Sequence, residues 1–195
     1  MQDRTLTGTF NVEFNSSDEL QLQAYQRFER LPLNFVISPG VVVPAGGYVY
    51  ENVKLQYTMA TQRKLNGQLS IARGSFYGGT RTTGEYSGRM GFSAHLALEP
   101  TLTVNWVELP YGRFTARLLG TRLVVTPSAR LAFSSLTQFN PSAHTLSSSV
   151  RMRWDYIPGS EMFVVYSDGR DTAGEKFPLL QNRSFAVKVT RLLRF

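Results

Sequence analysis

The sequence predicts an all-β protein: an antiparallel up-and-down transmembrane β-barrel, or a large part of one, with about 11 to 12 strands in this chain. Three observations predict this class. Most of the chain alternates apolar and polar residues with a period of two, which is typical of β-strands. No run approaches the roughly 18 apolar residues that a membrane-spanning helix needs. Short and longer connections alternate along the chain, as they do in outer-membrane barrels.

The clearest alternation closes the chain, in residues 182–195. Phe185, Val187, Val189, Leu193 and Phe195 share one face, which Arg191 interrupts, and the interleaved face is mainly polar. A barrel strand needs such a division, because one face meets lipid and the other meets the lumen. The terminal aromatic Phe195 resembles the signal that the barrel-assembly machinery recognises, so we predict a role for it in assembly.

Ten further segments carry strand patterns. A long connection at residues 30–47 holds three prolines and three glycines, so we expect no central strand there. The segment 80–98 shows the most regular alternation, and its length exceeds that of an average soluble strand. The predicted strands are 5–14, 19–29, 48–60, 67–77, 80–98, 101–109, 115–125, 129–139, 145–157, 161–167 and 182–195.

The connections predict an orientation. Short polar turns are expected at 15–18, 61–67, 99–101, 126–128 and 158–160, and mostly longer loops at 30–47, 110–114, 140–144 and 168–181. Only the tight hairpin at Gly78 and Gly79 departs from this alternation. Because the short turns of such barrels are periplasmic, we expect the chain to end at the periplasmic rim.

Charged residues concentrate on the polar faces of the predicted strands, where they would line a lumen. They form either an internal lattice of ion pairs or a cationic passage that favours anionic solutes. Nucleic-acid binding is not expected, because the basic residues are spread over many strands and form no single patch. The predicted lumen-lining residues are Arg27, Lys54, Arg81, Glu85, Arg89, Arg117, Arg130, Arg151, Arg153, Asp155 and Lys188.

The sequence contains no visible catalytic constellation. A Ser-His-Asp arrangement would have to use His95 or His144, the two histidines of the chain, and no Gly-x-Ser-x-Gly motif occurs. The chain has no cysteine and no cluster of histidines, so we predict no catalytic residue, no metal site and no cofactor.

Several segments resemble a known family. The segments GSFYGG at 74–79, SSVRMRWDYIPGSEMFVVYSDGRDT at 148–172 and the ending VKVTRLLRF are similar to the carboxy-terminal barrel of bacterial outer-membrane proteins that carry an amino-terminal family 9 carbohydrate-binding-like module. Members of this family are often uncharacterised or labelled "membrane-associated hydrolase". The resemblance implies that residues 1–195 are a carboxy-terminal barrel domain. It implies no catalytic set.

The resemblance also implies what such a protein would have besides this domain. The opening residues lack the pattern of a secretory signal, so we expect a fragment without the signal peptide, the module and the first strand or strands. The expected location is the bacterial outer membrane. The expected partners are outer-membrane lipid, the assembly machinery and, through the missing module, carbohydrate.

Two alternatives remain open at this stage. The first is a soluble antiparallel β-sandwich or a lipocalin-like binding protein, in which the apolar faces form a core. The second is an outer-membrane hydrolase, which is suggested only by the family label. The leading hypothesis is a structural or porin-like barrel with a polar, arginine-rich lumen.

Overall fold

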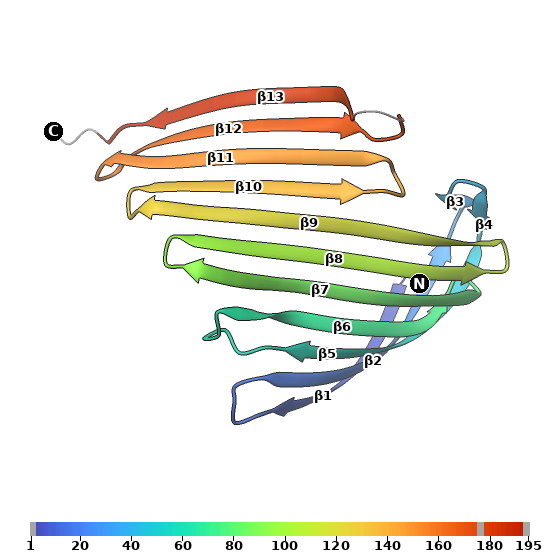
Figure 1. Cartoon of the computed structure of the whole chain (residues 1–195). Coiled ribbons are helices and arrows are strands. Elements are labelled where there is room, and N and C mark those ends of the chain that lie inside the picture. Colours follow the sequence, from blue (N-terminus) through green and yellow to red (C-terminus); the bar gives the residue numbers. More distant parts are fainter. Residues whose placement is uncertain (1–2, 175–177, 193–195) are drawn as a thin grey trace. The chain divides into compact units, whose positions relative to one another are not determined.

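The chain folds almost entirely into antiparallel β-structure. The computed structural model describes residues 3–174 and 178–192. Eleven strands form one up-and-down sheet in the order β1-β2-β5-β6-β7-β8-β9-β10-β11-β12-β13, and β3 and β4 form a separate two-stranded sheet (Figure 1). Among the described residues there is no helix that is long and apolar enough to cross a membrane.

The sheet confirms the predicted fold class and the predicted eleven strands of an antiparallel up-and-down arrangement. The strands are β1 (Asp3–Glu13), β2 (Glu19–Leu31), β3 (Phe35–Ser38), β4 (Val41–Val43), β5 (Gly46–Thr58), β6 (Leu65–Phe76), β7 (Gly79–Ser93), β8 (Leu96–Leu109), β9 (Gly112–Ser128), β10 (Leu131–Asn140), β11 (Thr145–Ile157), β12 (Ser160–Asp171) and β13 (Leu179–Thr190).

Several predicted boundaries were wrong. The turns expected at 99–101 and 126–128 lie inside β8 and β9, and the chain instead turns at residues 94–95 and 129–130. The predicted loop 168–181 is shorter, because β12 continues to Asp171 and β13 begins at Leu179. The connections at residues 77–78 and 110–111 are as short as the turns at the other end of the strands. The predicted difference between short turns at one end of the strands and longer loops at the other therefore holds mainly for the connections around 32–45 and 172–178.

The chain forms two compact units, which we describe separately. Unit 1 comprises residues 1–87 and 102–117, and unit 2 comprises residues 88–101 and 118–195. In unit 1 the registers of β1, β2, β5 and β6 place Phe10, Leu22, Leu55 and Ile71 on one face of the sheet. We call this side the apolar face. The opposite side, which carries Gln23 and its register partner Lys54, is the polar face.

The apolar face is the more exposed side of unit 1. Phe10 is 65% exposed, Val53 53% and Ile71 54%. Buried side chains lie on the other face instead, including Tyr50, Asn52 and Ser70. A water-soluble β-protein has the reverse arrangement, with its apolar side chains packed inside.

The largest group of buried side chains in unit 1 involves the small β3–β4 hairpin. Val43 of β4 is fully buried and packs with Tyr50 of β5 and with Tyr77, which follows β6. The Tyr48 hydroxyl donates a hydrogen bond of 2.8 Å to the carbonyl of Pro44. The predicted loop 30–47 therefore contains an ordered hairpin that packs against polar-face aromatic residues of the neighbouring strands.

The turn between β6 and β7 explains the Gly-Gly signal of the sequence. Tyr77 and Gly78 have φ angles of 48° and 78°, and two consecutive positive φ angles are typical of a type I′ hairpin turn. Only Gly adopts such an angle without steric cost. The second glycine, Gly79, lies so close to the backbone of Glu108 that a Cβ atom would collide with it.

Asp18 connects two turns of unit 1. Its carboxylate accepts hydrogen bonds from the backbone N–H of Ala60 and from the hydroxyl of Ser16, both at 2.8 Å, and forms an ion pair with Arg63 at 2.8 Å. These contacts favour the charged form, the Ala60 N–H most of all, and lower the pKa of Asp18 to about 2. The β1–β2 turn is thus fixed to the β5–β6 turn.

In unit 2, strands β9 to β13 form consecutive antiparallel pairs. The registers place Ser134, Arg151, Val165 and Ala186 on one face and Ser135, Val150, Tyr166 and Phe185 on the other. On the second of these faces, Val150 and Tyr166 of the interior strands β11 and β12 are 43% and 38% exposed. An exposed apolar face therefore occurs in this unit too.

Candidate functional site

The candidate site is the set of charged side chains on the polar face. In unit 1, β5 places Lys54 opposite Gln23 of β2 and Ala72 of β6. The Lys54 ammonium lies 3.4 Å from the carboxylate of Glu85 on β7, and the Ser70 hydroxyl donates to the same carboxylate oxygen at 3.1 Å. Two predicted lumen residues, Lys54 and Glu85, are thus brought together as an ion pair.

Arg27 and Arg81 lie farther along the same face, where they line a common cavity of about 110 Å³. The Arg81 guanidinium lies over the ring of Phe76, at 4.2 Å from its centroid. The hydroxyl of Tyr50 donates to the carboxylate of Glu29 at 3.0 Å. This part of the polar face therefore combines aromatic rings with charged groups.

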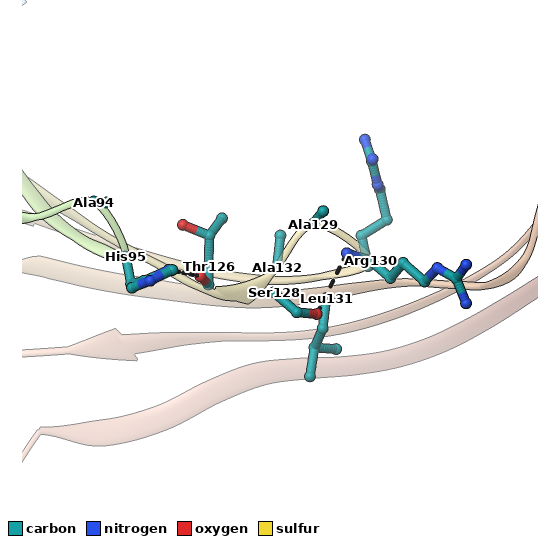
Figure 2. A pocket seen from close by; sticks show the side chains of 9 residues that line it. Ala94, His95, Thr126, Ser128, Ala129, Arg130, Leu131 and Ala132 are labelled. Atoms are coloured by element: carbon teal, nitrogen blue, oxygen red, sulfur yellow. Dashed lines mark hydrogen bonds between the residues drawn. The ribbon is translucent and has the colours of Figure 1, made fainter.

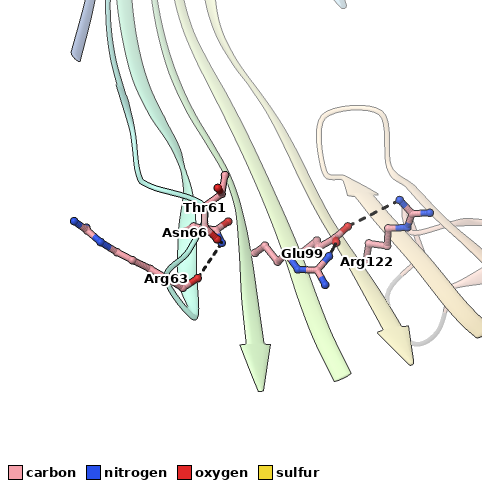
Figure 3. A network of polar contacts seen from close by, with 6 residues as sticks. Thr61, Arg63, Asn66, Glu99 and Arg122 are labelled. Carbon is pink, nitrogen blue, oxygen red and sulfur yellow. Dashed lines mark hydrogen bonds and ion pairs between the residues drawn. The ribbon is translucent and has the colours of Figure 1, made fainter. Parts of the chain in front are cut away.

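In unit 2, Glu99 lies between two arginines. Its carboxylate is 2.7 Å from a guanidinium nitrogen of Arg89 and 3.9 Å from one of Arg122 (Figure 3). Arg89 was a predicted lumen residue, whereas Glu99 and Arg122 were not. One carboxylate facing two guanidinium groups leaves a local excess of positive charge.

Strand β11 carries a second basic group of unit 2. The register places Arg151 opposite Val165 and Arg153 opposite Phe163. The Arg151 guanidinium lies 4.8 Å from the ring centroid of Phe163, and Arg153 forms an ion pair of 2.9 Å with Asp155. Lys188 of β13 is also a register partner of Phe163 and so lies on the same face.

Two cavities lie at the turns of unit 2. One, of about 420 Å³, is lined by residues of the turns at 94–95 and 129–130 together with Arg153 (Figure 2). The other, of about 500 Å³, is lined by Arg130, Arg153, Asp155 and residues of the turn at 158–159. Arg130 and Arg153 thus line both cavities, and in the second cavity they face the carboxylates of Asp155 and Glu161.

Two predicted lumen residues have different positions from those expected. Arg130 lies in the turn before β10, not on a strand face. Arg122 and Gly120 lie on the same face of β9. This is the polar face, because a Cβ atom on Gly120 would meet the side chain of Thr101 there. Alternation then places Arg117 on the opposite, apolar face. The predicted assembly residue Phe195 lies outside the described residues.

Glu99 and Arg122 were not predicted as polar-face residues, and the reason is physical. The sequence around Arg122, from Leu118 to Val125, is apolar on both faces, so it does not reveal which face is polar. Glu99 precedes Pro100 and was interpreted as part of a turn.

Among the described residues, neither histidine ring forms a hydrogen bond with a serine or threonine hydroxyl. The ring Nδ1 of His95 lies 2.7 Å from the carbonyl oxygen of Thr126, and the nearby Ser128 hydroxyl accepts a hydrogen bond from the backbone N–H of Arg130 (Figure 2). His144 lies in the turn between β10 and β11. Nothing in this geometry supports hydrolytic chemistry.

In unit 2 the basic side chains placed on the polar face outnumber the acidic ones. Arg89, Arg122, Arg151, Arg153 and Lys188 lie on this face with Glu99, Asp155, Glu161 and Asp171. In unit 1, Arg27, Lys54 and Arg81 lie there with Glu13, Glu19, Glu29 and Glu85. The excess of positive charge among the described residues of this face therefore belongs to unit 2.

No family model matches the chain, and no curated protein matches it. The family resemblance of the sequence thus stays a prediction. Among solved structures, the chain is similar to one described as "NanC porin structure in rhombohedral crystal form". The two are 8% identical, the match covers 98% of this chain and 94% of that chain, and the TM-score is 0.45.

Proposed function

We propose that the chain is an outer-membrane β-barrel whose polar face lines a pore and favours anionic solutes. One observation carries the membrane part of this proposal: most of the large apolar side chains are on the exposed face, and most of the polar and charged ones are on the other. Exposed apolar area of this extent is unfavourable in water. It is favourable where lipid covers it, and outer-membrane barrels are built in this way.

The preference for anions rests on the charges that the polar face carries in unit 2. Arg89 and Arg122 share Glu99, Arg153 has Asp155 as its partner, and Arg151 stacks on an aromatic ring without a carboxylate. Rings or rows of arginine in a pore lower the energy of anions relative to cations. A water-filled passage along this face should therefore conduct anions better than cations.

The soluble alternative receives no support from this distribution, because a sandwich or lipocalin-like protein would bury its apolar face. The hydrolase alternative has no contact among the described residues in its favour. Lipid as a partner is part of our proposal. Recognition by the assembly machinery and an association with a carbohydrate-binding module stay predictions from the sequence.

A bilayer measurement tests the proposal. The protein, folded in detergent, is inserted into a planar bilayer, and the reversal potential is measured across a potassium chloride gradient. We expect an anion-selective potential. The double variant Arg151→Ser and Arg153→Ser should lower the anion preference several-fold, because it removes two cations and leaves Asp155 without its partner.

Arg73→Ser is the matched control, because Arg73 pairs with Val53 on the apolar face of unit 1. This variant removes one arginine and should keep the anion preference of the parent protein. Folded protein that gives no conductance would contradict the pore. An unchanged reversal potential in the double variant would contradict the role of the β11 arginines.

A further inference from the structure

A groove of about 450 Å³ lies on the apolar face of unit 1, across β2 and β5 to β8. All the residues that line it belong to this unit. Since one water molecule takes up about 30 Å³, the groove has room for roughly fifteen groups of that size, which is enough for the methylene groups of one fatty-acyl chain. Most of its lining is aliphatic or aromatic and includes Leu55, Ile71, Tyr86, Val104 and Trp106.

Gly84 accounts for the hollow in the sheet surface. Alternation along β7 places it on the same face as Tyr86, at a position without a side chain. A Cβ atom on Gly84 would lie 3.5 Å from the ring of Trp106, which is an ordinary van der Waals contact. Its φ angle is not positive, so the backbone does not require a glycine here. The missing side chain therefore opens space between larger neighbours.

One end of the groove is polar. The ring of Tyr57 lines the groove, and its hydroxyl lies beside the Asp18 carboxylate and the Arg63 guanidinium. The groove thus ends at the turn between β5 and β6. Asp18 pairs with Arg63 there, whereas the next residue, Lys64, is exposed and forms no ion pair with the part of the chain that the structure describes.

An apolar groove with a cationic end matches an amphipathic molecule with an anionic head. Around a barrel, the acyl chains of a phospholipid lie against the apolar side, and its phosphate lies at the membrane interface. Tyrosine side chains are enriched at this interface, and lysines near it attract anionic headgroups. Tyr57 and Lys64 are therefore placed as an interfacial site requires, with the groove on the hydrocarbon side of them.

We propose that this groove binds one phospholipid with an anionic headgroup: an acyl chain fills the space at Gly84, and the phosphate lies at Lys64 and Arg63. The inference deepens the proposed function and rests on it, since a lipid reaches the groove only if the apolar face lies in the membrane. It also goes further, because a lipid-facing surface as such requires neither a groove nor a preference among headgroups.

Quenching of tryptophan fluorescence by brominated acyl chains tests this site. The chain has two tryptophans, so Trp154→Phe leaves Trp106 in the groove as the single one. This protein is folded into phosphatidylcholine vesicles that contain a small fraction of brominated lipid, either phosphatidylglycerol or phosphatidylcholine. Brominated phosphatidylglycerol should quench Trp106 with an apparent affinity about fivefold higher, the factor expected of one lysine at an anionic headgroup.

Trp154 provides a control position on the same kind of surface. Its register partner is Met162, and it shares the exposed apolar face of unit 2 with Val150. In the reciprocal variant Trp106→Phe, the two brominated lipids should therefore quench Trp154 equally. A preference for phosphatidylglycerol at Trp154 as strong as that at Trp106 would mean that no particular groove binds the lipid.

Filling the groove tests where the acyl chain lies. Gly84→Leu should weaken the quenching of Trp106 by brominated phosphatidylglycerol roughly tenfold, because several methylene groups lose their place. Gly8→Leu is the matched control. It adds the same side chain to the apolar face of β1, where a Cβ atom would meet nothing within 4 Å, and it should leave the quenching unchanged.

Removing a charge tests where the headgroup lies. Lys64→Gln should make the two brominated lipids quench Trp106 equally, and it spares Arg63, which holds the turn through Asp18. Arg113→Gln is the matched control. It removes an exposed positive charge of the same unit beside the turn at residues 110–111, and it should keep the preference for phosphatidylglycerol.

The outcomes separate this site from the proposed function. Equal quenching of Trp106 by both lipids, or a preference that survives in folded Gly84→Leu or Lys64→Gln, would overturn the site alone. Heat-modifiable mobility on gels shows whether each variant has folded. In vesicles made only of brominated lipid, Trp106 should be quenched strongly in every folded variant. Absence of quenching there would contradict the membrane location itself.

Discussion

At the scale of single residues, Asp18 shows how a turn is held at one end of the sheet. Its pKa of about 2 lies below the ordinary value of 3.8, because the Ala60 N–H, the Ser16 hydroxyl and Arg63 stabilise the carboxylate. A group whose pKa is lowered by folding contributes stability above its unfolded pKa and loses it as the pH falls through the folded value. The contact between the two turns should therefore persist at pH 4 and be lost near pH 2.

The amide signal of Ala60 measures this directly. In a pH titration its chemical shift should move with a midpoint of about 2, because its acceptor becomes protonated. In Asp18→Asn the same signal should show no such transition. A midpoint near 4 in the parent protein would mean that the three contacts do not form in solution.

Residue positions also show where prediction from the sequence fails. Lys54, Arg151 and Arg153 belong to strands with clean alternation, and the registers place them on the expected polar face. Arg117 belongs to β9, where leucines and valines occupy both faces, so alternation could not decide its side. The face of a charged residue is predictable only where its strand is apolar on one side alone.

At the scale of elements, the β3–β4 hairpin is the part of unit 1 that most depends on burial. Val43 is fully buried, and its neighbour Val42 is 44% exposed. Val43→Ala removes two methyl groups from a packed site and should destabilise the docked hairpin by about 2 kcal/mol. Opening of the hairpin should become roughly thirtyfold more frequent.

Hydrogen exchange of the hairpin amides in the folded protein measures this opening. The exposed counterpart Val42→Ala should change the exchange rates little, since it leaves the packing with Tyr50 and Tyr77 intact. Equal rates in the two variants would show that Val43 does not hold the hairpin in solution.

The number of strands was predictable, but some turns were not. Apolar side chains stay at even-numbered positions on both sides of the turn at 94–95, as Tyr86 and Leu102 of the same apolar surface show. The alternation of apolar and polar residues therefore continues through this turn, and the sequence does not reveal that the chain turns there. Pro100 and Pro127 suggested turns, yet both lie within strands, where proline is tolerated if its missing N–H is not needed in the ladder.

The β3–β4 hairpin was missed for a different reason. Its prolines and glycines exclude a central strand, and residues 32–45 indeed lie outside the main sheet. Short strands joined by a glycine at a positive φ angle, here Gly40 with 78°, leave too brief a pattern to be recognised. What orders the hairpin is contact with aromatic residues far away in the sequence, and such contacts carry no local signal.

At the scale of the whole molecule, the central question is which medium covers the apolar face. Ile71 is 54% exposed on this face of β6, and Gln68 lies on the polar face of the same strand. If lipid covers the apolar face, Ile71→Arg places a charge in hydrocarbon and should destabilise the folded protein in vesicles by about 2–4 kcal/mol. Gln68→Arg should cost much less, because it points to the polar side.

The two variants distinguish a membrane protein from the soluble alternative, because the expected order of their stabilities is reversed for a protein folded in water. A soluble protein would gain solubility from an arginine in place of an exposed isoleucine and would fold without lipid. Folding into vesicles, followed by heat-modifiable mobility in a urea series, gives the comparison. If Ile71→Arg folded as well as Gln68→Arg, or if the parent protein stayed folded and monomeric without detergent, the apolar face would not be a lipid-facing surface.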